Sequence, residues 1–181
     1  MIGSDIAKRY AKAFFDIAAE DQKYEDYYNE LKSFSSLIDD NKDLREFLAN
    51  PVFDQSEKKS VVEQLLSRVR MSGMTANFLR LLVDKKRIGI AGEIAESYRQ
   101  LMDSKLRRVR VSVKTAFPLD GDIAGNLKTK IAEMTGKDVE MSIEEDSALI
   151  GGVVVRVGDT LYDGSIKTQL NNIRKLLGEE I

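Results

Sequence analysis

The 181-residue sequence contains no cysteine and no histidine. Without cysteine there can be no disulfide bond and no thiolate metal site. Without histidine the commonest general base and the commonest metal ligand are both missing. Carboxylates, lysines, tyrosines or a cation held by oxygen atoms remain for catalysis, and all of these residue types are also ordinary surface residues. We therefore expect a protein that is not an enzyme and that uses no cofactor and no metal.

Long hydrophobic runs are also missing. No segment approaches the roughly 18 to 20 uninterrupted apolar residues that a membrane-spanning helix requires. The first five residues, MIGSD, lack the basic and then apolar plan of a signal peptide. Because 43% of the residues are hydrophobic, the chain can still bury a core. These features predict a soluble, intracellular protein that does not insert into a membrane.

Neither sign of charge is in excess, because the formal net charge is only -2. Acidic and basic side chains are also balanced in each half of the chain. Two short basic clusters stand out, at residues 85–87 (KKR) and 107–110 (RRVR). No aromatic residues interleave with them, as a base-stacking surface for nucleic acid requires. A solvated face is the favoured interpretation, and we expect no nucleic-acid partner. An RNA-binding module that uses both clusters stays as an alternative.

The chain has two parts with different patterns, and the boundary lies near residue 105. Only four of the twelve glycines fall in residues 1–105, and the alternating valine runs are confined to the remainder. Apolar residues in the first part recur at helical spacing and predict six helices. Since each apolar stripe must be buried against another element, six short-linked helices predict a compact bundle.

Helix boundaries in the first part follow from local signals. Asn50-Pro51 must end a short third helix, because the residue before a proline avoids helical geometry. Asp54, with Glu57 three residues later, predicts a capping box for the fourth helix, and Gly73 suits the end of that helix. The last two helices are expected at residues 75–86 and 90–105.

The second part, residues 106–181, is expected to be a small α+β sandwich. Valines and other apolar residues alternate with polar ones around residues 109–113, 139–143 and 153–157, which is typical of half-buried strands. A helix that ends at Gly136 separates the first two strands. Gly158-Asp159 fits a two-residue hairpin turn, and a last helix begins near Ser165 with Ile166, Leu170, Ile173 and Leu177 on one side.

The glycines and aspartates of residues 149–170 suggest either a phosphate-binding loop or a structural framework. A phosphate loop needs a glycine-rich turn that leads directly into a helix, whereas here Gly151-Gly152 leads into a valine strand. Turn and cap roles are favoured for Asp159 and Asp163, with cation binding as the alternative. A small enzyme that holds a divalent cation at residues 144–146 (EED) and Asp159 is the competing function.

Four segments carry a resemblance to a known family. Residues 150–166, IGGVVVRVGDTLYDGSI, resemble the C-terminal signature of the delta subunit of F-type ATP synthase, the bacterial relative of the mitochondrial oligomycin-sensitivity-conferring protein. Residues 9–16 (RYAKAFFD), 47–51 (FLANP) and 77–82 (NFLRLL) resemble its first helix, its helix-ending proline and its fifth helix. The resemblance covers essentially the whole chain. The signature residues that we expect to be structural are Gly151, Gly152, Gly158, Asp159, Asp163, Gly164 and Ser165.

The resemblance implies a non-catalytic stator subunit with two partners. The six-helix bundle of residues 1–105 would bind the N-termini of alpha subunits, and residues 106–181 would bind the b subunits of the peripheral stalk. One copy per complex would keep the catalytic head from turning with the rotor during proton-driven ATP synthesis. The expected location is the cytoplasmic face of the cell membrane, as a peripheral part of the complex in a bacterium or an organelle.

The resemblance also implies a binding groove between the first and fifth helices. Both helices carry apolar arcs wider than one bundle face requires, and a central place in the bundle is the alternative explanation. The expected residues for contact with alpha are Tyr10, Ala13, Phe14, Phe78, Leu81 and Leu82. For the stalk contact we expect Tyr162 on the hairpin and Arg174 on the last helix.

Overall fold

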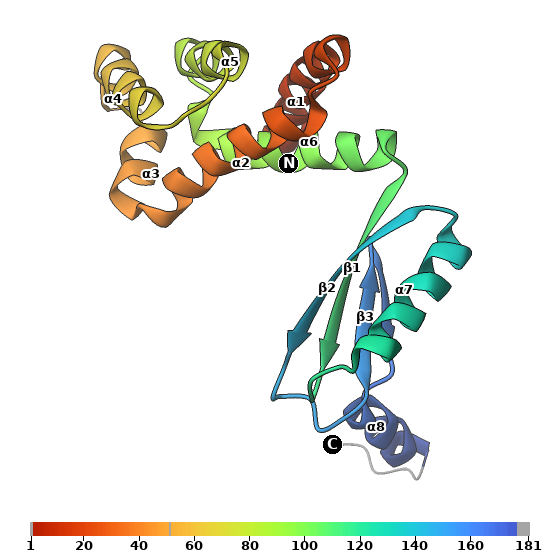
Figure 1. Cartoon of the computed structure of the whole chain (residues 1–181). Coiled ribbons are helices and arrows are strands. Elements are labelled where there is room, and N and C mark those ends of the chain that lie inside the picture. Colours follow the sequence, from red (N-terminus) through yellow and green to blue (C-terminus); the bar gives the residue numbers. More distant parts are fainter. Residues whose placement is uncertain (1, 51, 177–181) are drawn as a thin grey trace. The chain divides into compact units, whose positions relative to one another are not determined.

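The computed structural model describes residues 2–50 and 52–176, and for residues 2–4 and 175–176 it describes the backbone alone. The chain divides into two compact units, Met1–Met102 and Asp103–Ile181. The described residues are mostly helical and include one small four-stranded sheet, as the fold-class prediction states at this level (Figure 1). Each unit is described by itself below.

Unit 1 consists of helices joined by short connections. In chain order they are α1 (Ile2–Asp21), α2 (Tyr24–Asp40), α3 (Lys42–Ala49), α4 (Gln55–Arg68), α5 (Gly73–Asp84), the short 3-10 helix η1 (Ile88–Ile90) and α6 (Ala91–Lys105), whose end runs past the boundary between the units at Met102.

The local signals at the ends of α3 and α4 are confirmed. Helix α3 ends at Ala49, directly before Asn50-Pro51, and the Asn41 side chain caps its start by accepting a hydrogen bond from the Leu44 amide at 3.1 Å. Asp54 and Glu57 form the expected capping box of α4. Caps satisfy amides at the start of a helix that have no partner within it, so these boundaries follow from the nearby sequence.

One expectation in unit 1 is wrong. Gly73 does not end α4, which stops at Arg68. It is the first residue of α5, and Ser72 caps that helix by accepting a hydrogen bond from the Thr75 amide. The error concerns a helix boundary, because a glycine can follow the end of one helix or begin the next.

The core of unit 1 is built around aromatic side chains. Phe14 of α1 stacks on Phe78 of α5, with ring centroids 4.2 Å apart, and lies 5.5 Å from Tyr27 and 5.6 Å from Tyr98. The Tyr98 hydroxyl donates to the Tyr24 carbonyl at 3.1 Å, and burial raises the pKa of Tyr98 above its ordinary value. A single aromatic residue of α1 therefore joins three other helices.

Unit 2 contains the sheet. Its elements are β1 (Arg108–Thr115), α7 (Gly121–Thr135), β2 (Asp138–Glu145), β3 (Val153–Val157), β4 (Thr160–Asp163) and α8 (Ile166–Leu176). The strand order is β2-β1-β3-β4. Strands β1 and β2 are parallel and linked through α7, whereas β3 is antiparallel to both β1 and β4.

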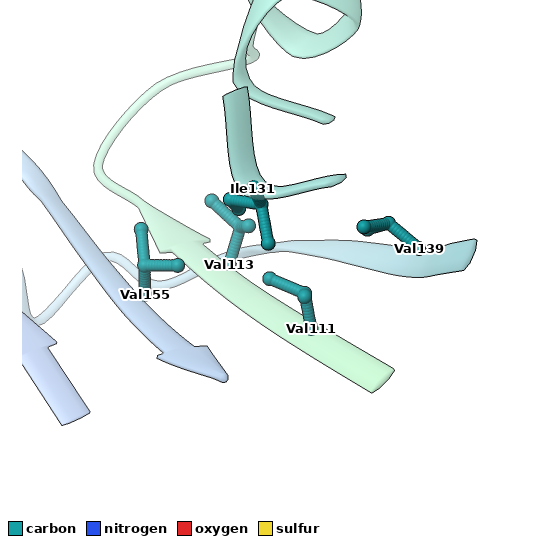
Figure 2. Packing of buried hydrophobic residues seen from close by; sticks show 5 residues of the cluster. All are labelled: Val111, Val113, Ile131, Val139 and Val155. Atoms are coloured by element: carbon teal, nitrogen blue, oxygen red, sulfur yellow. The ribbon is translucent and has the colours of Figure 1, made fainter. Parts of the chain in front are cut away.

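Helix α7 covers one face of the sheet. Figure 2 shows Ile131 of α7 over Val111 and Val113 of β1, with Val139 of β2 and Val155 of β3 on either side. The opposite face carries charged pairs across neighbouring strands, among them Arg110 with Glu140 at 2.9 Å and Lys114 with Glu144 at 3.7 Å. Alternation along each strand thus separates a valine layer from an ionic layer.

Candidate partner-binding surface

The first and fifth helices contact each other as expected, through the stacked rings of Phe14 and Phe78. The six expected alpha-binding residues therefore lie on two adjacent helices. They fall into a buried group and a surface group, because a side chain that fills the space between two helices is not available on their surface.

Three of the six residues are in the core. Phe14 and Leu82 are fully buried and Phe78 is 7% exposed. Their burial means that these three residues contribute almost no exposed surface in this structure, and their part in binding alpha stays a prediction. Aromatic stacking beneath the surface holds the two helices at a fixed spacing.

The other three residues reach the surface. Ala13 is exposed, Tyr10 is half-buried, and Leu81 is 43% exposed. Tyr10 belongs to an apolar row along α1 that also includes Ile6 and Ile17, both half-buried. A small residue at position 13 leaves room for the backbone of another helix to approach.

The structure adds Met74 to this surface. Met74 is 39% exposed and lies seven residues before Leu81 on α5, so both side chains lie on the same helical face, with exposed Asn77 between them. The sequence interpretation missed Met74 because it started the fifth helix at residue 75. The Ser72 cap before Gly73 was the signal that could have extended the helix. We use the name α1–α5 surface for Tyr10, Ala13, Met74 and Leu81.

Helix α5 is held at its start by a carboxylate from α2. The two Glu30 oxygens accept from the Ser72 amide and the Ser72 hydroxyl, both at 2.7 Å, and from the Thr75 hydroxyl. Thr75 is fully buried. A negative charge at a helix N-terminus also interacts favourably with the helix dipole, so Glu30 ties α5 to α2.

Helix α5 is also held by α4. The Gln55 amide donates to the carbonyls of Val83 and Asp84 at 3.1 and 2.7 Å, where α5 ends. Arg80 donates to both carboxylate oxygens of Glu63 at 2.6 and 2.9 Å, and this pairing lowers the pKa of Glu63. The α1–α5 surface therefore rests on a helix fixed at both ends and in the middle.

The glycines of the C-terminal signature allow two backbone segments to approach closely. A Cβ atom on Gly152 would lie 2.4 Å from the Gly164 carbonyl oxygen, and Gly152 has a φ of +83°. A Cβ atom on Gly151 would lie 2.6 Å from Cδ1 of Ile166. Backbone hydrogen bonds join the same segments, from Gly164 to Val153 at 2.9 Å and from Ile166 to Gly151 at 3.0 Å.

The remaining signature residues form a turn and a cap. Gly158, with a φ of +57°, and Asp159 make the expected two-residue hairpin between β3 and β4. Asp163 accepts from the Ser165 amide at 2.9 Å and from the Thr168 hydroxyl at 2.8 Å, and these bonds lower the pKa of Asp163. The Ser165 hydroxyl accepts from the Thr168 amide at the start of α8.

The two expected stalk residues lie on different elements of unit 2. Tyr162 is 52% exposed on the edge strand β4, opposite Val155 in the register. Arg174 is exposed on α8. Leu177, expected on the apolar side of this helix, lies outside the described residues.

Comparison with known proteins decides the family. The model of the family described as ATP synthase delta (OSCP) subunit matches residues 6–177. The chain belongs to this family. The ATP synthase subunit delta of Syntrophus aciditrophicus is 63% identical over all 181 residues of this chain and over the whole of that protein. The subunit delta of Anaeromyxobacter sp. (strain Fw109-5) is 41% identical over 177 residues, which cover 98% of this chain and 99% of that protein.

A solved structure shares the fold. A chain in the cryo-EM structure of the Toxoplasma gondii mitochondrial ATP synthase hexamer matches 97% of this chain and 98% of its own length, with a TM-score of 0.68 and 21% identity. At this identity the match concerns the fold alone. Thus the sequence comparisons identify the delta (OSCP) family, and the structural comparison shows that the arrangement of helices and strands is shared with a solved structure.

Charged residues that were considered for cation binding or RNA binding form ion pairs and hydrogen bonds within the chain. Asp146 accepts from the Ala148 amide at 3.0 Å and pairs with Lys114, which lowers the pKa of Asp146. Arg110 of the second basic cluster pairs with Asp103 and Glu140. Within residues 2–50 and 52–176, no three Asp or Glu side chains are grouped to hold a metal ion, and no helix is long and apolar enough to cross a membrane.

Proposed function

We propose that this chain is the stator subunit that links the catalytic head of an F-type ATP synthase to its peripheral stalk. The observation that carries the proposal is the family match over residues 6–177. Helices α1 to α6 act as a six-helix bundle that binds the N-termini of alpha subunits. The small α+β domain of unit 2 binds the b subunits, with one copy of the chain per complex.

The subunit contributes no catalytic step. Its two contacts resist the torque that the rotor applies to the head while proton flow drives ATP synthesis. It is peripheral and lies on the cytoplasmic face of the membrane, held there by the complex. The hydrolysis and synthesis of ATP belong to the other subunits.

The contact with alpha is made at the α1–α5 surface. An amphipathic helix from alpha lies along α1 and α5, its apolar side chains against Tyr10, Met74 and Leu81, and its backbone near Ala13. The support for this placement is the exposure of these apolar residues on two helices that are locked together by Phe14 and Phe78. The anchoring of α5 by Glu30, Gln55 and Glu63 provides a rigid platform, which reduces the entropy lost on binding.

The proposal predicts that Ala13→Asp weakens binding of a synthetic peptide from the alpha N-terminus at least tenfold. A carboxylate placed in an apolar contact loses its water without gaining a partner, at a cost of a few kcal/mol. Leu81→Asp is expected to act in the same way. Calorimetric titration measures the affinity, and circular dichroism checks that the helices remain folded.

Ser36→Asp is the matched control, because Ser36 is exposed on α2 and the change introduces the same charge. It should leave peptide affinity unchanged. If Ala13→Asp and Ser36→Asp bind the peptide equally well, alpha does not bind at this surface. If copurification from native membranes recovers the wild-type chain without alpha and beta subunits, the proposed function itself is wrong.

A further inference from the structure

Helix α8 carries an apolar stripe that is open to solvent. Ile166, Leu170 and Ile173 are 42%, 49% and 52% exposed, and their spacing of four and then three residues places them on one helical face. Every residue from 169 to 174 is exposed. Ile166 lies against Gly151 at the start of the helix, whereas Leu170 and Ile173 each leave about half of their surface open to solvent.

Among the described residues, the hydrogen bonds that hold α8 to the rest of unit 2 involve its first turn. Ile166 donates its amide to the Gly151 carbonyl, and Thr168 is held by Asp163 and Ser165. Most helices in proteins are stabilised by burial of an apolar face and not by intrinsic helix propensity alone. Helix α8 is therefore expected to gain stability when a partner covers its stripe.

The neighbouring loops extend the apolar area. Strands β1 and β2 are parallel and β3 is antiparallel to β1, so the ends of β1 and β2 and the start of β3 lie at one end of the sheet. Figure 1 shows α8 at this same end. Phe117, in the loop after β1, is 70% exposed, and Ile150, in the loop before β3, is 63% exposed. Exposed apolar residues gathered at one end of a domain are typical of an interaction site.

The charges beside the stripe restrict the partner. The α8 sequence IKTQLNNIRKL contains no acidic residue. Lys167 and Arg174 are seven residues apart and so lie along the same border of the stripe. Neither pairs with an acidic side chain of residues 2–50 or 52–176. A partner with acidic side chains along one border of its own stripe complements this arrangement.

Two other occupants fit less well. In a second copy of this chain, α8 would bring the same basic border, and like charges disfavour that pairing. Helices that bind a membrane surface usually combine a polar face rich in lysine and arginine with a broad apolar face of tryptophan, phenylalanine and leucine. The stripe of α8 has three aliphatic residues in its described part and no aromatic one. A protein helix with an acidic border is therefore the occupant that the chemistry favours.

We propose that α8 is the docking helix of unit 2 and that it binds an amphipathic helix of the peripheral stalk whose apolar stripe is bordered by acidic residues. The proposal rests on the proposed function, because it takes the stalk as the partner. It adds the docking element and the charge that the stalk helix must carry. It also gives a role to Arg174, whereas Tyr162 lies on the separate strand β4.

The test measures binding of the full chain to the water-soluble part of the b subunit from the same organism. Leu170→Asp is expected to weaken binding at least tenfold, and so is the double variant Lys167→Glu with Arg174→Glu. Wild-type affinity should fall as salt increases, and the double variant should lose most of that dependence. All of these side chains are exposed, so circular dichroism should show unchanged folding.

Matched controls come from α7. Met134→Asp places a carboxylate at a residue that is 75% exposed, and Lys128→Glu with Lys130→Glu changes the net charge as much as the α8 double variant does. Both controls should bind b like the wild type. If Leu170→Asp also binds like the wild type, α8 is not the docking helix, although the proposed function stands. If the wild-type chain does not bind b, the stalk contact fails and the docking proposal fails with it.

Two further measurements separate the other occupants. Vesicles that contain phosphatidylglycerol test a membrane surface, and sedimentation tests self-association. If Leu170→Asp abolishes vesicle binding or dissociates a dimer while b binding is unchanged, the proposal is overturned. If wild type and variant behave alike in both assays while only b binding is weakened, the proposal is supported.

Discussion

Replacing Gly152 with alanine tests whether the signature is a close-packed framework. The new Cβ atom would lie 2.4 Å from the Gly164 carbonyl oxygen and 3.0 Å from the Ser165 Cα atom. Both neighbours are backbone atoms, so the segment that leads from β4 into α8 must move. Real Cβ atoms essentially never approach other heavy atoms within 3.0 Å. Because the neighbours here belong to the backbone, rotation of a side chain cannot relieve the overlap.

Two costs add in the Gly152→Ala variant. The φ of +83° is disfavoured for alanine by about 1 to 2 kcal/mol. Overpacking of a close contact typically costs a further 1 to 3 kcal/mol, roughly. We therefore expect the free energy of unfolding of unit 2 to fall by about 2 to 5 kcal/mol.

Gly158→Ala separates the two costs. Gly158 also has a positive φ, +57°, but a Cβ atom there would meet nothing within 4 Å. This variant should lose only the conformational part, about 1 to 2 kcal/mol. Amide hydrogen exchange of β3 and β4 reports the stability of unit 2, and urea unfolding followed by circular dichroism gives an independent value. Equal losses in the two variants would refute the close-packing explanation of the signature.

Two further predictions concern unit 1. Glu30→Ala should lower the free energy of unfolding of this unit by about 2 to 3 kcal/mol, because it removes a carboxylate that accepts from Ser72 and Thr75. Chemical denaturation measures this, with Glu30→Gln expected to lose less, and a neutral Glu30→Ala would exclude a stabilising role for the carboxylate. The second prediction follows from the pKa of Tyr27, which is raised to about 12 chiefly because its hydroxyl donates to Asp21. A raised folded-state pKa contributes stability that is fully present below the ordinary value of about 10 and is lost as pH rises through about 12, so stability should decline across this range. Asp21→Asn should reduce the decline in alkaline unfolding curves, and an unchanged decline would show that the Asp21 contact does not cause it.

Structural features that depend on neighbouring residues in the chain were predicted correctly. The capping box of α4, the proline after α3, the αL cap at Gly136 and the Gly158-Asp159 hairpin were each identified within a few residues. Alternating valines located the strands because a half-buried strand has a period of two. The pattern did not specify that β1 and β2 are parallel, since strand partners are chosen by packing.

The candidate site could be predicted only in part. The sequence indicated two helices that do contact each other, but not which of their residues reach the surface. Phe14, Phe78 and Leu82 are inside because rings from several helices meet there, whereas Met74 and Leu81, the helical neighbours of Phe78 at spacings of four and three residues, are 39% and 43% exposed. Apolar side chains of both groups look alike in the sequence, so burial depends on where the neighbouring helices lie.

The start of α5 shows what the local sequence determines and what tertiary contacts decide. Ser72-Gly73 fits either the end of one helix or the cap of the next, and local preferences alone do not decide. Glu30, which is 42 residues away, completes the cap and makes Gly73 the first helical residue. The sequence alone determined the family, the helices and strands, and the tight turns, because these depend on short-range patterns. Tertiary packing decided which apolar residues remain exposed for partners, because exposure depends on contacts between distant segments.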